Sequence, residues 1–285
     1  MTYRILATTA SALSLCAGLA AADGHAGTTG YALAKEGTTL VVMPSIAAPG
    51  EATTLALSTP LSAIAYRPVT GDLLGFANGA LYTINTATGA LTNLDADFAP
   101  NATIAPDAMV AFDFNNKIDA VRAVSSAGDN LVYFPEGFGN GDEKAGSVRR
   151  FTSLAYAEGD ANEGQTPQIF ANAYTNAIAG ETASGTFQYA LDAETNALVS
   201  LANNAGTLAT IAPITVDGAA VDILPSGGFD ITSPAEGTDS AYAILQLNGD
   251  ESAGLYAINV SSGAATLLSD LGMGGFTGFA ASMGR

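Results

Sequence analysis

The chain has 285 residues, of which 27 are acidic and 9 are basic, and its formal net charge at pH 7 is −18. This acidity argues against nucleic-acid backbones and anionic lipid surfaces as partners, because both carry the same sign of charge as the protein. Only 13% of the residues are charged, and Gly, Ala, Thr, Ser and Asn fill the difference, a composition that favours strands and turns over helices.

Residues 1–22 (MTYRILATTASALSLCAGLAAA) have the form of a secretory signal peptide. A cation precedes a short apolar run, and small residues close the run at Ala22. The run is shorter than the roughly 20 residues of a bilayer span, so we expect no membrane span. Cys16 lies inside it, but Leu15 stands where a lipoprotein signal has a small residue. We therefore expect cleavage before Asp23 and a mature protein in the periplasm or secreted from the cell.

The mature chain is expected to consist of a flexible N-terminal tail, residues 23–29, and a single domain, residues 30–285. Cys16 is the only cysteine, so the mature chain has no disulfide and no thiol chemistry. His25, the only histidine, lies in the tail, which is a poor position for the base of a nucleophilic enzyme. Zinc and copper sites need several His or Cys ligands. Conventional hydrolases and transition-metal enzymes are therefore disfavoured.

A hairpin pattern recurs along the chain. Residues 81–91 (LYTINTATGAL) and 255–265 (LYAINVSSGAA) match in register, and residues 188–198 (QYALDAETNAL) form a weaker copy. Each has alternating apolar residues, an Asn or Asp that starts a turn, and a Gly or Asn suited to positive φ, so each predicts a β-hairpin. Residues 39–50 and 131–137 are degenerate versions. A further β-like pair follows the copy at 188–198, so its place within its unit stays open.

A second pattern marks five strands, each with a small residue followed mostly by aromatic or aliphatic residues at alternate positions: 63–67, 111–115, 171–175, 228–232 and 278–282. The last copy has no hairpin after it, and the first hairpin has no such strand before it. This offset predicts an all-β propeller of five four-stranded blades, closed when the C-terminal strand pairs beside residues 31–33. A β-sandwich is the alternative. Residues 95–108 and 135–168, rich in Gly, Pro, Asp and Asn, are predicted to be loops.

These motifs together resemble a known family. The block AFDFNNKIDAVRAVSSAGDNL (111–131), the hairpin LYTINTATGAL, AYTN (173–176), and GFDI (228–231) followed by LYAINVSSGAATLL are similar to the secreted bacterial family catalogued as domain of unknown function 4394. The resemblance runs from about Tyr31 to Ala281 and implies an exported, propeller-like domain without an established activity. It also leads us to expect an Asp at the position of Ala65, so an acidic site shared with the family would be depleted here.

One aligned position on the predicted inner strands holds Ala65, Asp113, Ala173, Asp230 and Ala280. If these side chains face the channel, the two carboxylates form one acidic site for a cation or a cationic group. If they face neighbouring blades, each needs a buried partner, and an ion pair of Asp113 with Arg122 is the favoured structural interpretation. The candidate ligand-binding residues of the channel are Asp113, Asp230, Arg122, Arg67, Tyr66, Tyr174 and Asn176.

Calcium is the one metal cofactor that the composition allows, because hard cations take oxygen ligands. The acidic loops at 140–143, 158–163 and 248–251 all lack the spacing of the known twelve-residue calcium loop. Solvated turns are the favoured interpretation, and we expect no cofactor.

The leading functional hypothesis is an exported, monomeric, non-catalytic module that binds a protein or a small molecule. Loops exposed at both faces of a ring of sheets, together with the missing catalytic residue types, motivate it. One alternative is a propeller hydrolase or lyase that uses calcium or carboxylates. Another is a structural cell-surface protein.

Overall fold

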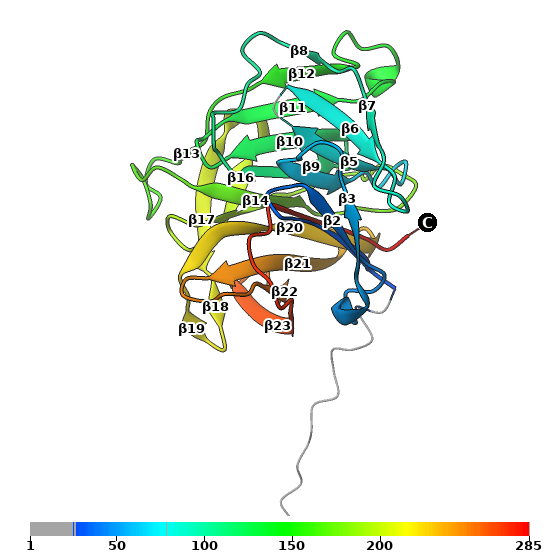
Figure 1. Cartoon of the computed structure of the whole chain (residues 1–285). Helices are drawn as coiled ribbons and strands as arrows, with labels where there is room; N and C mark the ends of the chain where they lie inside the picture. Colours follow the sequence, from blue (N-terminus) through cyan, green and yellow to red (C-terminus); the bar gives the residue numbers. More distant parts are fainter. Residues whose placement is uncertain (1–24, 26, 78, 285) are drawn as a thin grey trace, which may run out of the picture.

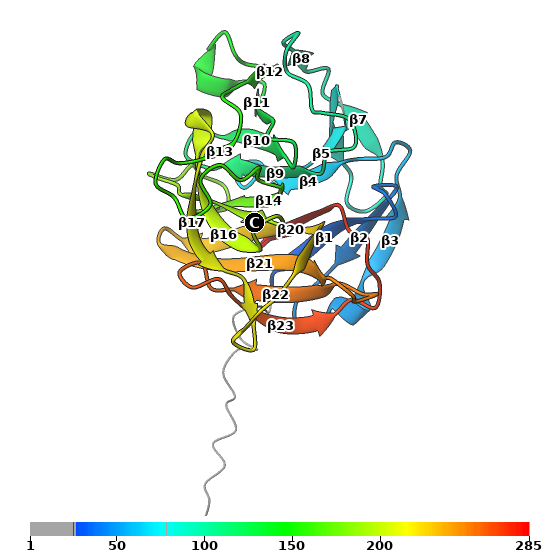
Figure 2. The same ribbon diagram turned by 90° about the vertical axis from the view of Figure 1, so that its left-hand side faces the viewer.

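The computed structural model describes residues 25, 27–77 and 79–284, so the predicted signal peptide, residues 1–22, lies outside the described part. Within that part no helix is long and apolar enough to cross a membrane. Almost all of the regular structure is β-strand, arranged as five sheets around one axis (Figures 1 and 2). The predicted five-bladed propeller is confirmed.

Two blades have four strands each. From the axis outward, the first blade contains β24 (Gly278–Ser282), β1 (Thr29–Ala34), β2 (Thr39–Met43) and β3 (Thr53–Ala56), with the 3-10 turn η1 (Pro49–Glu51) before β3. The second contains β4 (Ala63–Tyr66), β5 (Leu73–Ala77), β6 (Ala80–Ile84) and β7 (Leu91–Asn93).

The other three blades carry extra short strands at the rim. The third contains β9 (Val110–Asn115), β10 (Ala120–Ser125), β11 (Asn130–Phe134), η2 (Phe138–Asn140), β12 (Ser147–Arg150) and β8 (Asp97–Phe98). The fourth contains β14 (Ile169–Tyr174), β15 (Gln188–Asp192), β16 (Ala197–Ala202), η3 (Asn203–Ala205), β17 (Thr207–Pro213) and β13 (Ala155–Tyr156). The fifth contains β20 (Ile223–Ala235), β21 (Thr238–Leu247), β22 (Gly254–Ile258), β23 (Ala264–Asp270), β18 (Thr215–Val216) and β19 (Ala219–Ala220).

The five strands of the second sequence pattern are the innermost strands of the five blades. Around the axis they follow the order β24, β4, β9, β14 and β20, and β20 lies against β24 again. Alternating side chains point toward the blades on either side, which explains why apolar residues fill these strands so completely. Closure by the C-terminal strand is also confirmed, because β24 pairs antiparallel with β1, with Tyr31 opposite Ala280 and Leu33 opposite Gly278.

The hydrophobic core is divided among the blade interfaces. Five clusters of buried side chains each lie between two neighbouring blades, such as Phe76 with Phe112 between the second and third. A sixth, smaller cluster lies within the third blade around Phe134. Each interface therefore depends on the ring as a whole, because a blade that loses a neighbour exposes one of its apolar faces.

The structure resolves one open point about local structure and corrects the two predicted loops. The copy at 188–198 forms β15 and β16, the second and third strands of its blade, whereas the copies at 81–91 and 255–265 cover third and fourth strands. The predicted loops at 95–108 and 135–168 contain strands β8, β12 and β13, which extend the rims of two blades.

The expected tail, residues 23–29, also packs against the domain where it is described. Thr28 is buried and Thr29 is the first residue of β1. The Nδ1 atom of His25 lies 2.8 Å from the Tyr242 hydroxyl on the fifth blade. The packed part of the chain therefore begins before residue 30.

Candidate functional site

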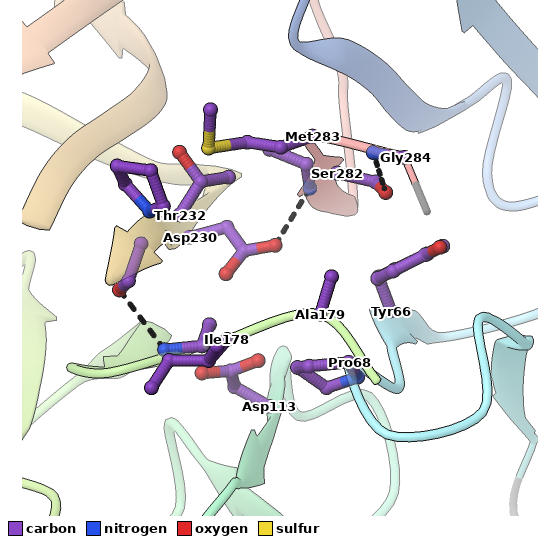
Figure 3. Close-up of a pocket in the computed structure, with 14 residues that line it drawn as sticks. Tyr66, Pro68, Asp113, Ile178, Ala179, Asp230, Thr232, Ser282, Met283 and Gly284 are labelled. Atoms are coloured by element: carbon purple, nitrogen blue, oxygen red, sulfur yellow. Dashed lines mark hydrogen bonds between the residues drawn. The ribbon is translucent and has the colours of Figure 1, made fainter. Parts of the chain in front are cut away.

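A cavity of about 230 Å³ lies where the inner strands end on one face of the propeller (Figure 3). Every blade contributes to its lining, so it lies on the propeller axis. The lining residues are Tyr66, Pro68, Asp113, Ala177, Ile178, Ala179, Asp230, Thr232, Ser233, Pro234, Ala281, Ser282, Met283 and Gly284.

Asp230 joins the fifth blade to the first. It lies on β20 with an exposed fraction of 4%. Its Oδ1 accepts a hydrogen bond from the backbone N–H of Ile231 at 2.7 Å, and its Oδ2 accepts one from Ala281 of β24 at 2.6 Å. Burial raises the pKa of Asp230 to about 7, although these two backbone donors act in the opposite direction.

Asp113 occupies the same position on β9 and joins the third blade to the fourth. Its exposed fraction is 5%, and its Oδ2 accepts a hydrogen bond from the backbone N–H of Tyr174 on β14 at 2.6 Å. Burial, followed by the negative charge of Asp230, raises the pKa of Asp113 well above its ordinary value. Each carboxylate thus contacts the next inner strand and also lines the cavity, so the two sequence interpretations of this position are not exclusive.

The predicted ion pair of Asp113 with Arg122 is wrong. The two residues are opposite each other on β9 and β10, but the structure contains no ion pair between them in the described chain. The guanidinium instead donates to the Tyr174 hydroxyl from Nε at 2.9 Å, to Asn130 Oδ1 from Nη1, and to Asn204 Oδ1 from Nη2 at 2.8 Å. The hydrogen-bond donors of Arg122 are therefore paired with uncharged oxygen acceptors at the interface of the third and fourth blades, and not with a carboxylate.

Of the seven predicted channel residues, three line the cavity: Asp113, Asp230 and Tyr66. The Tyr66 ring stacks on Tyr31, with 6.4 Å between ring centroids.

The remaining four predicted residues form contacts outside the cavity lining. Arg67 forms a bidentate ion pair with Asp119. Tyr174 directs its hydroxyl to Arg122 and to Asn203 Oδ1. Asn176 links two loops, since its side chain donates to the Gly185 carbonyl and accepts from the Gly237 N–H.

The most prominent part of the site that sequence reasoning missed is the loop between β14 and β15, residues 175–187, which we call the crossing loop. It reaches from the fourth blade across the cavity to three others. Gly180 donates to the Pro68 carbonyl at 3.0 Å, Ala183 donates to the Asn116 carbonyl at 3.1 Å, and Ala177 donates to Ser233 Oγ at 3.0 Å. The crossing loop therefore forms one wall of the cavity, with Ile178 and Ala179 in the lining.

Two buried hydroxyls in the lining were also missed. Ser282 accepts a hydrogen bond from the Gly284 N–H at 3.0 Å. Thr232 has an exposed fraction of 4%, and its Oγ1 takes part in none of the hydrogen bonds formed within the described chain. Both lie on inner strands, where the sequence pattern does not distinguish a cavity-lining hydroxyl from one that faces another blade.

In two of the three acidic loops considered for calcium, a carboxylate is paired with donors of the protein itself. Asp142 pairs with Lys144, and Asp160 accepts from the backbone N–H groups of Asn162 and Thr210. Among residues 25, 27–77 and 79–284, no group of three or more His, Cys, Asp or Glu side chains is placed to share a metal ion.

The carboxylate pair predicts a pH dependence of stability. The pKa of Asp230 rises from 3.8 to about 7 in the folded protein, so the folded state binds its proton more tightly than the unfolded state does. The resulting stability is complete below the unfolded value and is lost as the pH rises through the folded value. Relative to Asp230→Asn, which cannot titrate, the native protein should lose about 2–3 kcal/mol of unfolding free energy between pH 5 and pH 8.

Urea unfolding at the two pH values measures this difference. The other titratable or charged side chains of the described residues that lie against the pair are Tyr66, Tyr174 and Arg122. Asp97→Asn, at an exposed position on β8, should follow the native protein at both values. A difference between native protein and Asp230→Asn that stays constant with pH would contradict the prediction.

Comparison with known proteins gives a family and several distant structures. The family model described as "Domain of unknown function (DUF4394)" matches residues 40–280. No curated protein matches the chain.

Solved structures similar to this chain include two from Bacteroides. A protein of unknown function from Bacteroides caccae has 7% identity and a TM-score of 0.45, with 89% of this chain and 98% of that chain covered. An auxiliary nutrient binding protein from Bacteroides thetaiotaomicron has 12% identity and a TM-score of 0.42, with 75% of this chain covered. This chain spans 55% of the length of that second protein.

Proposed function

Because the chain belongs to the DUF4394 family, whose description assigns no activity, we propose from the site itself that it is an exported, non-catalytic binding module for a small molecule. The observation that carries this proposal is the axial cavity, which has two buried carboxylates in its lining and receives residues from all five blades. Ligand sites are typically concave, mostly apolar and furnished with a few placed polar groups.

The propeller supports binding because it holds the lining side chains in place before any ligand arrives. Asp113 and Asp230 are each fixed by a backbone N–H of the adjacent inner strand. Ser233 is fixed by its contacts with Asp239 and with the crossing loop. Preorganised groups lose little conformational freedom on binding, which favours affinity.

One observation favours an enzyme instead. Two buried carboxylates with raised pKa values in one cavity are also typical of acid–base catalysis, as in a carboxylate-dependent hydrolase or lyase. No His, Cys, Lys or Arg side chain of the described residues lines the cavity. Because both carboxylates also hold neighbouring strands, we favour binding over catalysis.

A thermal-shift screen tests the binding function. The purified protein is heated with small solutes of positive, neutral and negative charge, and Asp97→Asn serves as a folded control with one carboxylate fewer. A ligand present at about 100 times its Kd adds about 2.7 kcal/mol of stability, which corresponds to about 5 °C for a chain of this size. The shift should be smaller in Thr232→Val, which removes one hydrogen-bonding group from the cavity, and unchanged in Asp97→Asn. A screen without any shift, or robust turnover of an ester or lactone, would refute the proposal.

Export rests on the pattern of residues 1–22. The intact mass of the protein recovered from its native host should correspond to a chain that begins at Asp23. A lipid-modified Cys16 at the terminus would contradict this part of the proposal.

A further inference from the structure

We propose that the axial cavity binds a compact organic cation with a single positive charge, whose N–H groups donate to Asp113, Asp230 and the Thr232 hydroxyl. This inference rests on the proposed binding function and names the class of ligand. Four features of the cavity support it.

The charge of the lining is one-sided. Among the described residues, the lining contains two carboxylates and no basic side chain, while Arg122 and Arg67 are turned toward other partners. A buried carboxylate is strongly disfavoured unless a positive group or several donors accompany it. Each of these two carboxylates has backbone donors only, so a cation in the cavity would supply the missing opposite charge.

The Thr232 hydroxyl is a separate indication of a polar ligand. Thr232 is 4% exposed and lines the same cavity as the carboxylates, yet its Oγ1 forms no hydrogen bond within the described residues. A ligand N–H placed between Asp230 and Thr232 would satisfy this oxygen.

The number of charges follows from the position of both carboxylates in the lining of one cavity. The charge of Asp230 is felt at Asp113, so the site does not readily hold two ionised groups while it is empty. One ionised carboxylate and one protonated carboxylic acid together carry a single negative charge. A monocation neutralises that charge, whereas a dication would require a second proton to leave.

The rest of the lining suits a hydrocarbon better than a metal ion. Pro68, Ile178, Ala179 and Met283 present carbon surface to the cavity (Figure 3). Pro234 also belongs to the lining. The described residues provide no third carboxylate or imidazole for a metal. At about 230 Å³ the cavity is smaller than the roughly 300–1,000 Å³ of typical ligand sites, so the organic part must be small.

Isothermal titration with four chloride salts tests the inference: ammonium, ethylammonium, tetramethylammonium and calcium, with sodium acetate and ethanol as anionic and neutral probes. Ethylammonium should bind most tightly, because it has both N–H donors and a carbon part. Tetramethylammonium has the same charge but no N–H, so it should bind at least tenfold more weakly. Binding should strengthen as the pH rises from about 5.5 to 8, because an ionised carboxylate is required. Near pH 5.5 binding should release a proton to the solvent, and this release should diminish toward pH 8.

Variants locate the bound cation. Asp230→Asn should weaken ethylammonium binding by about 10- to 100-fold, as expected for the loss of a charge-assisted hydrogen bond. Thr232→Val, which keeps the shape and removes the hydroxyl, should weaken it by about 2- to 10-fold. Circular dichroism confirms that each variant folds. Asp97→Asn should bind like the native protein.

The outcomes separate the two proposals. Cavity binding of ethanol or acetate that Thr232→Val abolishes would overturn the cation inference and leave the binding function intact. Stoichiometric calcium binding without ethylammonium binding would overturn it in favour of a metal site. Equal affinity for ethylammonium and tetramethylammonium would show that N–H donors do not contribute to binding, which contradicts the inference. Absence of binding by all six probes would overturn the inference, and the broader thermal-shift screen then decides the binding function separately.

Discussion

Removal of residues 275–285 should abolish cooperative unfolding, because β24 is the innermost strand of the first blade. It pairs with β1 and lies against β4 on one side and β20 on the other. Without it, β1 becomes an open edge, and the buried Phe276 and Phe279 no longer fill the interface between the first and fifth blades. We expect a shallow, non-cooperative transition in urea, with binding of a hydrophobic dye before denaturant is added.

A point variant tests ring closure without shortening the chain. A Cβ built at Gly228 of β20 would lie 2.3 Å from the Phe279 backbone nitrogen of β24, so Gly228→Ala must push the two inner strands apart. Overpacking of this kind typically costs about 1–3 kcal/mol, and backbone crowding places this case at the upper end. Gly50→Ala is the matched control, since a Cβ there meets nothing within 4 Å. A truncated protein that melts as cooperatively as the intact one would contradict the closed ring.

Arg122→Met should destabilise the protein by about 3 kcal/mol, because it leaves buried acceptors without their donor. The arginine is 3% exposed and donates to Tyr174, Asn130 and Asn204 across the interface of the third and fourth blades. Methionine fills much of the same space but donates nothing. Urea unfolding measures the loss.

A double-mutant cycle measures how much of the lost stability comes from the hydrogen bond between Arg122 and Tyr174. Tyr174→Phe alone removes one hydroxyl and should cost about 1 kcal/mol. Since Tyr174 and Arg122 share a hydrogen bond, the double variant should lose less than the sum of the two single variants. Arg149 donates from Nε to Ser147 Oγ of its own strand, so Arg149→Met should have a much smaller effect. An Arg122→Met protein as stable as the native one would show that desolvation of the guanidinium cancels its hydrogen bonds.

The ring could be predicted from the sequence because its evidence is local and repeated. Each inner strand lies between two blades, so the same alternation of small and apolar residues recurs at all five positions. The offset of the last copy near residue 278 indicated closure without any knowledge of long-range contacts. The same register placed Asp113 and Asp230 at one level of the ring, and both do line the cavity.

The partners of these side chains could not be predicted in the same way. Arg122 is directly opposite Asp113 in its own hairpin, yet it binds Tyr174 and Asn204 of the next blade. Strand register predicts which residues lie opposite each other within one blade. It does not predict that a neighbouring blade offers the arginine better hydrogen-bond acceptors. The crossing loop was missed for a related reason, since its anchors, such as Pro68, belong to blades that are far away in sequence.

The pairing of β24 with β1 has a consequence for how the molecule is made. Thr29 is opposite Ser282, so the strand pair that closes the ring connects residues about 250 positions apart in the sequence. Loop-closure entropy opposes such a contact until the intervening blades have condensed, and this step should be the slow one in folding. During that delay β1 offers an unpaired edge that any copy of β24 can complete. At high protein concentration two chains could therefore exchange their last strands, and refolding from denaturant should yield a domain-swapped dimer whose fraction grows with concentration.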